Sequence, residues 1–112
     1  MEDPIAIEVV LVELPGESQC EVTIQVGRPF EDPDYPGEWL CPVSLKPLYS
    51  SLRPARSNSA FQSLCLANSL VLDLLHAVVE KGGSVWLEPG NPYPFEAYAF
   101  GVAASLRKGC GQ

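Results

Sequence analysis

The sequence predicts an α+β domain in which an antiparallel β-meander of three to four strands packs against one long α-helix, followed by a short C-terminal element. Two early segments alternate apolar and polar residues across a Pro-Gly turn, as a β-hairpin does. A later segment is apolar at helical spacing and has capping residues at both ends. Because 112 residues can bury one core but are too few for two, residues 1–112 are expected to form a single domain.

Residues 5–27 are expected to form the hairpin. The first strand alternates apolar residues with more polar neighbours and is rich in β-branched residues, which favours a strand; the alternating residues are Ile5, Ile7, Val9 and Leu11. The second strand alternates in the same way through Cys20, Val22, Ile24 and Val26. Pro15 and Gly16 lie between the strands, in the central positions that a type II turn favours.

A third strand is expected over residues 39–45, between an acidic loop at residues 28–38 and an irregular loop at residues 46–58. The acidic loop holds three prolines, one glycine and four acids, which is typical of an exposed segment. The strand places Trp39, Cys41, Val43 and Leu45 on one face. Because Pro42 has no N–H for a ladder hydrogen bond, we expect this strand at a sheet edge or with a bulge.

Residues 59–81 are expected to form the long helix. Ser59 and Gln62 fit a capping box, and the pair Gly82-Gly83 follows as a stop signal. At about 100° per residue, the polar residues of the helix fall on one narrow stripe; these residues are Gln62, Ser69, Asp73, His76 and Glu80.

Nearly all the rest of this helix is apolar, and the apolar arc is wider than one sheet covers. The C-terminal segment, the long loops or a second copy of the chain must therefore cover its flanks, and the second copy would make a homodimer through the long helix. Asn68 lies within the arc. A buried amide needs a partner, which is either a loop carbonyl or a symmetric copy whose register it fixes.

After the helix, residues 84–88 are expected to form a short strand and residues 89–94 a turn. The C-terminal element at residues 95–108 fits two patterns. Its apolar residues suit one helical face, whereas Glu96, Tyr98 and Phe100 alternate with alanines as a strand would. The alanines favour the helix, although Gly101 disfavours it by about 1 kcal/mol.

The charge is unevenly distributed along the chain. The 14 acids and 7 bases give a net charge of −7, of which residues 1–45 carry −9 and residues 46–112 carry +2. An acidic domain repels phosphate groups, so nucleic acids and anionic membrane surfaces are unexpected partners. A basic protein partner is allowed, although the charge can also serve solubility alone.

The densest carboxylates occur together with aromatic residues, and this segment is the candidate binding site. Its predicted binding residues are Glu31, Asp32, Asp34, Tyr35, Glu38 and Trp39. Exposed aromatic residues among acids are typical of a surface that meets a basic, partly apolar partner. Two alternatives stay open: the aromatic residues fold back over the sheet edge, or the carboxylates hold calcium or magnesium weakly, although their spacing is not that of an EF-hand. We expect no metal and no cofactor.

The chain has no glycine-rich phosphate loop, no G-x-S-x-G elbow and no H-E-x-x-H motif, so we do not expect an enzyme. His76, the only histidine, is expected to be a solvated residue of the helix surface. No apolar run reaches about 18 residues without a polar interruption, and no secretory signal is expected after Met1. We therefore expect free thiols in a reducing cytoplasm, at Cys20, Cys41, Cys65 and Cys110.

Residues 39–43 (W-L-C-P-V) and 62–70 (Q-S-L-C-L-A-N-S-L) resemble a class of small uncharacterised bacterial domains. In that class a strand of W-x-C-x-V type leads through a loop into a helix that opens with Q-x-L-x-L-A. The resemblance covers roughly residues 5–81. It implies a small antiparallel sheet with a packed helix, and it brings no catalytic residues.

These features favour a small acidic cytoplasmic protein-binding domain, such as an immunity or inhibitor protein that neutralises a basic protein, for example a toxin. One alternative is a small-ligand binder or small enzyme, with a pocket between helix and sheet that involves His76 or a cysteine. A further alternative is a structural homodimer.

Overall fold

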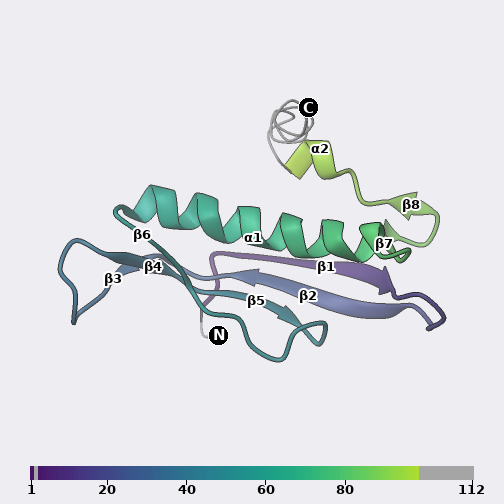
Figure 1. Ribbon diagram of the computed structural model, residues 1–112, viewed down its shortest axis with the longest axis horizontal. Coiled ribbons are helices and arrows are strands. Elements are labelled where there is room, and N and C mark those ends of the chain that lie inside the picture. The colour runs from purple at the N-terminus through teal and green to yellow at the C-terminus, as the bar shows by residue number, and fades with distance from the viewer. Residues whose placement is uncertain (2, 99–112) are drawn as a thin grey trace.

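The computed structural model describes Met1 and residues 3–98. In this part of the chain two antiparallel sheets pack with one long helix, which confirms the predicted α+β class (Figure 1). The larger sheet has the order β5-β2-β1-β7-β8 and contains β1 (Ala6–Glu13), β2 (Cys20–Val26), β5 (Val43–Lys46), β7 (Ser84–Glu88) and β8 (Asn91–Pro92). The smaller sheet has the order β3-β4-β6 and contains β3 (Phe30–Glu31), β4 (Trp39–Cys41) and β6 (Ala55–Ser57). The helices are α1 (Ala60–Glu80) and the one-turn α2 (Phe95–Tyr98).

β1 and β2 form the predicted hairpin, with Ala6 opposite Val26 and Val12 opposite Cys20. β2 buries one face, through Val22, Ile24 and Val26. In β1 the residues whose alternation indicated the strand do not form its buried face. Val10 and Val12 are fully buried instead, whereas Ile5, Ile7 and Val9 are exposed.

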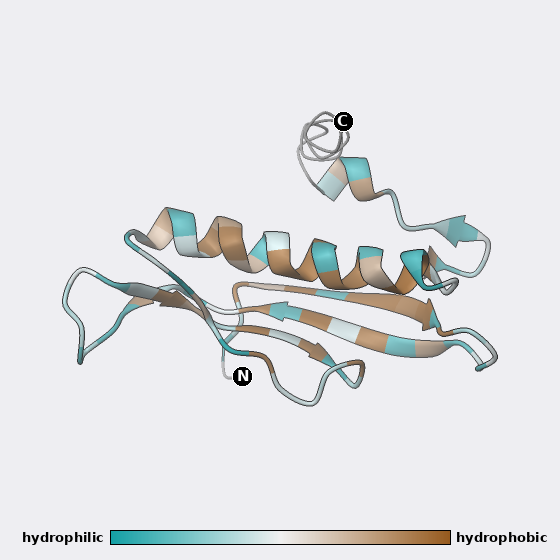
Figure 2. Ribbon diagram, viewed as in Figure 1, coloured by the Kyte–Doolittle hydropathy of each residue, from teal (hydrophilic) through white to brown (hydrophobic). Residues whose placement is uncertain are grey.

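The register of the hairpin explains which face of β1 is buried. Val10 lies opposite Val22, and directly opposed residues share a face of the sheet. β2 alternates between apolar and hydrophilic residues, whereas β1 is apolar over most of its length (Figure 2). β2 therefore has only one face that can be buried. The residues of β1 that lie opposite this face are buried with it.

The predicted third strand is divided at Pro42. β4 ends at Cys41 and belongs to the smaller sheet, and β5 begins at Val43 and forms an edge of the larger sheet. The Pro42 carbonyl accepts a hydrogen bond from the Gly27 N–H at 2.8 Å. The expectation of an edge strand is thus confirmed for β5, and the strand changes sheets at the residue that cannot donate a ladder bond.

The two segments expected to be loops each contain a short strand, which corrects the prediction. β3, within residues 28–38, pairs Phe30 with Leu40, and β6, within residues 46–58, pairs Arg56 with Leu40. Strands of two and three residues are too short to show an alternating pattern. They form because β4 offers one edge to each of them.

α1 begins and ends where the sequence predicts. The Ser59 hydroxyl accepts a hydrogen bond from the Gln62 N–H at 3.1 Å. At the other end Gly82 has a φ of 95°, and the Gly83 N–H donates to the Val78 carbonyl at 2.9 Å, which is a Schellman motif. A Cβ on Gly83 would lie 2.6 Å from the Glu13 carbonyl oxygen, so only glycine lets the helix end approach β1 this closely.

α1 buries one side and exposes the predicted polar stripe except for Ser69, which is half-buried. Its buried residues are Ser63, Ala67, Val71, Leu72, Leu75 and Val78. Part of the apolar arc stays exposed, including Phe61 at 76%. Asn68 is also exposed, so it does not need the buried partner that its position in the arc suggested.

The end of the described chain agrees with the expected order of elements. β7 has the predicted bounds, and the predicted turn contains the two-residue strand β8. Residues 95–98 form α2, as the alanine content favoured, and residues 99–108 of the predicted element lie outside the described residues.

By length and composition α1 could cross a membrane, although the core helix of a soluble protein meets the same criterion. About one third of its most apolar stretch is buried within the described fold. The expectation that the chain has no membrane partner stays a prediction.

We predict that Leu75→Ala lowers the free energy of unfolding by about 3 kcal/mol, because this fully buried side chain would leave a cavity. Leu66→Ala, on the same helix at 42% exposure, should change it by less than about 1 kcal/mol. Urea denaturation followed by circular dichroism measures both. Equal losses would show that α1 buries a different side.

Candidate functional site

The six predicted binding residues come together in one hairpin formed by β3, β4 and the turn between them. We call residues 30–41 the acidic hairpin. The Asp32 N–H donates to the Glu38 carbonyl at 2.8 Å, and the Glu38 N–H donates to the Tyr35 carbonyl at 3.1 Å. In Figure 1 the hairpin extends from the end of the molecule at which α1 begins. Its turn therefore lies at the periphery of the fold.

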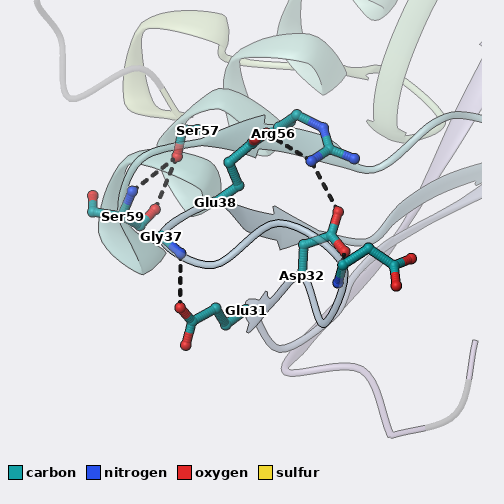
Figure 3. Close-up of polar contacts among 8 residues, drawn as sticks. Glu31, Asp32, Gly37, Glu38, Arg56, Ser57 and Ser59 are labelled. Atoms are coloured by element: carbon teal, nitrogen blue, oxygen red, sulfur yellow. Dashed lines mark hydrogen bonds and ion pairs between the residues drawn. The ribbon is translucent and has the colours of Figure 1, made fainter.

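Arg56 of β6 connects the two ends of this turn. Its Nη1 donates to Asp32 Oδ2 at 3.0 Å and to Glu38 Oε1 at 2.7 Å (Figure 3). The Arg56 guanidinium also lies 5.8 Å from the centre of the Tyr35 ring, within the range of a cation–π contact. One cation thus offsets part of the repulsion between two carboxylates and holds the turn against β6.

Asp32 is the buried carboxylate of the acidic hairpin, at 7% exposure. Its Oδ1 accepts a hydrogen bond from the Asp34 N–H at 2.9 Å. This bond, and then the Arg56 guanidinium, hold the pKa of Asp32 below its ordinary value, although desolvation opposes them. Hydrogen bonds to Glu38 and Asp32 raise the pKa of Arg56. Both partners are therefore charged at neutral pH.

The other members of the predicted set face solvent to different degrees. Glu31, Asp34 and Tyr35 are exposed, and Trp39 is half-buried. Glu31 Oε2 accepts a hydrogen bond from the Gly37 N–H at 2.9 Å, which fixes the far side of the turn. Asp32 and Glu38 therefore hold the shape of the hairpin through Arg56, and Glu31 does so through Gly37. Glu31 and Asp34 are also exposed at its surface.

Sequence reasoning missed the part that Arg56 plays. The residue stood in a segment read as irregular, so nothing indicated that it would face the acids. The sequence held one weak signal for this contact: Arg56 is a cation in the basic half of the chain, which follows the acid-rich half. Only the pairing of β6 with β4, which puts Arg56 opposite Leu40, brings it within reach.

A second feature is a cavity of about 300 Å³ between α1 and the larger sheet. Its walls are mainly apolar and include Ile24 and Leu72. Its polar residues are Glu8, Asn68, Tyr93 and Tyr98, from three separate parts of the chain. The described structure thus contains a pocket at the place that the ligand-binding alternative requires.

The Tyr98 hydroxyl donates to Glu8 Oε2 at 2.7 Å. Burial, followed by this contact with Glu8, raises the pKa of Tyr98 to about 12, so the phenol stays a neutral donor. The rings of Tyr93 and Tyr98 stack with their centres 4.4 Å apart. Both residues line the cavity.

His76 and the described cysteines do not line this cavity. His76 is exposed, lies 3.2 Å from Glu80 and packs edge-to-face on Phe95. Three cysteines are free: Cys20 is exposed, Cys41 buried and Cys65 half-buried, and Cys110 lies outside the described residues. Within residues 3–98, no group of three or more His, Cys, Asp or Glu side chains is placed to hold a metal ion.

Comparisons with protein-family models, with curated proteins and with solved structures found no match for this chain. The structure supports the resemblance drawn from residues 39–43 and 62–70 only as far as a small α+β fold.

We predict that Arg56→Gln raises the pKa of Asp32, because it removes one of the three groups that lower it, the other two being the Asp34 and Tyr35 N–H groups. Ionised Asp32 stabilises the acidic hairpin above the unfolded pKa of about 3.9, and this stabilisation is lost as the pH falls through the lowered folded pKa. An NMR titration of the Asp32 carboxyl carbon measures the change.

Arg53→Gln is the matched control, because it removes a nearby arginine for which the described structure shows no ion pair. It should leave the Asp32 titration where it is. A midpoint that does not move in Arg56→Gln would contradict the role of Arg56.

Proposed function

We propose that this chain is a small acidic protein-binding domain that presents its acidic hairpin to a basic protein. One observation carries the proposal: Arg56 is bound by Asp32 and Glu38, while Glu31, Asp34 and Tyr35 remain exposed around the same turn. The fixed acids give the turn one shape, and the exposed residues are available to a partner.

A turn that is already ordered loses less conformational entropy when it binds. Tyr35 is 58% exposed and Phe30 is 44% exposed, so two aromatic rings project beside the exposed acids. Aromatic anchors supply much of the binding energy in protein interfaces, and surrounding charges raise the encounter rate with an oppositely charged partner. The partner that suits this surface is basic with an apolar patch.

The more specific version of the proposal is an immunity or inhibitor protein of the cytoplasm that neutralises a basic toxin. Its support is the net charge of −7 and the small size of the chain. The resemblance to small bacterial domains is compatible with it. We propose binding as the activity, without catalysis.

The cavity supports a second candidate, a ligand site between helix and sheet. Its polar residues are Glu8, Asn68, Tyr93 and Tyr98, which stand in place of the histidine or thiol that the sequence suggested. A homodimer through α1 has weaker support. Phe61 and Val79 are about 27 Å apart along the axis, and Leu66 faces about 140° away from them, so these exposed residues do not form one patch. Light scattering tests the dimer.

We predict that a hairpin variant loses partner binding by about tenfold or more. It combines Glu31→Gln, Asp34→Asn and Tyr35→Ala; it removes the Tyr35 ring beside Arg56 but keeps the ion pairs of Arg56 with Asp32 and Glu38. Wild-type and variant proteins are immobilised, exposed to a lysate of the source organism and compared by quantitative mass spectrometry. A basic protein should be retained by the wild type and released at about 1 M salt, where charges are screened.

The control combines Glu17→Gln and Glu21→Gln, which remove the same number of carboxylates from the β1–β2 hairpin. It should retain the basic protein as the wild type does. Equal retention by the hairpin variant would overturn the proposal. Equal loss by the control would show that net charge alone acts.

A further inference from the structure

β1 is paired along only part of one edge. β2 pairs with it from Ala6 to Val12, but on the other side β7 pairs only with Leu11, Val12 and Glu13. In Figure 1, β7 lies beside the end of β1 at which the arrow points. The edge of β1 before Leu11 is therefore left without a neighbouring strand in the described part of the chain.

The hydrogen bonds of β7 show which backbone groups face this open edge. The Tyr93 N–H donates to the Val85 carbonyl at 3.0 Å, so the backbone N–H and C=O of Val85 point away from β1. In an antiparallel strand successive residues point their N–H and C=O groups to opposite sides. The backbone groups of Trp86 therefore point toward β1, and those of Leu11, the residue opposite Trp86, point toward β7.

Counting back by two along β1, Val9 and Ile7 point their backbone groups to the same side as Leu11. Within the described residues these groups have no hydrogen-bond partner on that side. Such a row of free donors and acceptors is a template for another extended strand.

The cavity lies along this same part of β1. Ala6, Ile7 and Glu8 all line it, together with Leu72 of α1 and Tyr98 of α2. Ala6 and Glu8 are on the face of β1 that is turned toward α1, because they lie four and two residues before the buried Val10 on the same side of the strand. A strand added at this edge would thus direct every second side chain into the cavity and the others along Ile7 and Val9.

The two faces of the edge favour different residues in that strand. Ile7 and Val9 are 59% and 46% exposed and favour an apolar cross-strand neighbour. The cavity has apolar walls and one carboxylate, Glu8, and none of its described lining residues is Lys or Arg. A lysine or arginine fits it, because the aliphatic stem can lie along the walls while the charged end reaches Glu8.

We propose that the open edge of β1 binds an extended segment of a partner protein in which basic and apolar residues alternate. The segment pairs its backbone with Ile7 and Val9, and it places a basic side chain beside Glu8. This site is separate from the acidic hairpin and does not rest on the function proposed for it.

The test uses a capped synthetic peptide that alternates lysine and valine. On binding, it should slow amide hydrogen exchange of Ile7 and Val9 by about tenfold or more, measured by NMR. The matched peptide is N-methylated on the edge that would face β1, so it keeps the side chains and loses the pairing donors. It should bind at least about tenfold more weakly. A peptide that alternates glutamate and valine tests the charge and should also bind more weakly.

Two variants test the protein side. Val9→Pro removes the N–H on the open edge and should abolish the protection of Ile7. Glu8→Gln should weaken binding of the lysine peptide several-fold and leave the fold intact. If Val9→Pro fails to fold, the N-methylated peptide still tests the backbone pairing on the wild-type chain.

Three results would overturn the proposal. The first is no change at Ile7 and Val9 with saturating peptide, and the second is equal binding of the N-methylated peptide. The third is protection of both amides before any peptide is added, which would mean that the edge is already occupied. Sedimentation would then show whether the edge is occupied by a second copy, which gives a dimer, or by another part of the same chain, which gives a monomer. None of these outcomes affects capture by the acidic hairpin.

Discussion

The constraint on which this structure depends is that β2 has only one face that can be buried. Val22, Ile24 and Val26 are buried, and the residues between them are polar. Because the hairpin register is fixed, Val10 and Val12 must face the same side, and α1 covers that side. β1 is apolar on both faces, so the same constraint leaves Ile7 and Val9 exposed. The buried face and the exposed strip of β1 both follow from the pattern of β2.

A second constraint acts where the chain leaves this sheet. Pro42 separates β4 from β5, and β4 then pairs with both β3 and β6 in a sheet of its own. That arrangement brings a cation from a distant segment to a turn rich in carboxylates. Carboxylates that close together repel one another unless a cation or N–H groups lie between them. Arg56 and the Asp34 N–H provide both, so the acidity of the acidic hairpin is part of its structure as well as of its surface.

The sequence predicted elements with a strong local pattern, and it failed where distant contacts decide. The β1–β2 hairpin, the capped helix and the interruption at Pro42 each have a local signal, and the structure contains all three. No local pattern indicated which face of β1 is buried, because apolar residues occur on both faces of this strand. The positions of Arg56 and Glu8 depend on pairings between distant segments, and no spacing along the chain encodes them. The candidate residues of the acidic hairpin are close together in the sequence, but which of these acids is buried could not be predicted from it.

The two proposed surfaces use different physical interactions, and this difference bears on how one small domain could use both. The acidic hairpin offers exposed charge and aromatic rings, and its attraction for a basic partner is screened by salt. The edge of β1 offers backbone hydrogen bonds and an apolar cavity, which salt affects much less. Charge mainly raises the rate of encounter, whereas paired backbone and buried side chains mainly slow dissociation. A partner with a basic surface and a basic–apolar extended segment could therefore be attracted by the first surface and retained by the second.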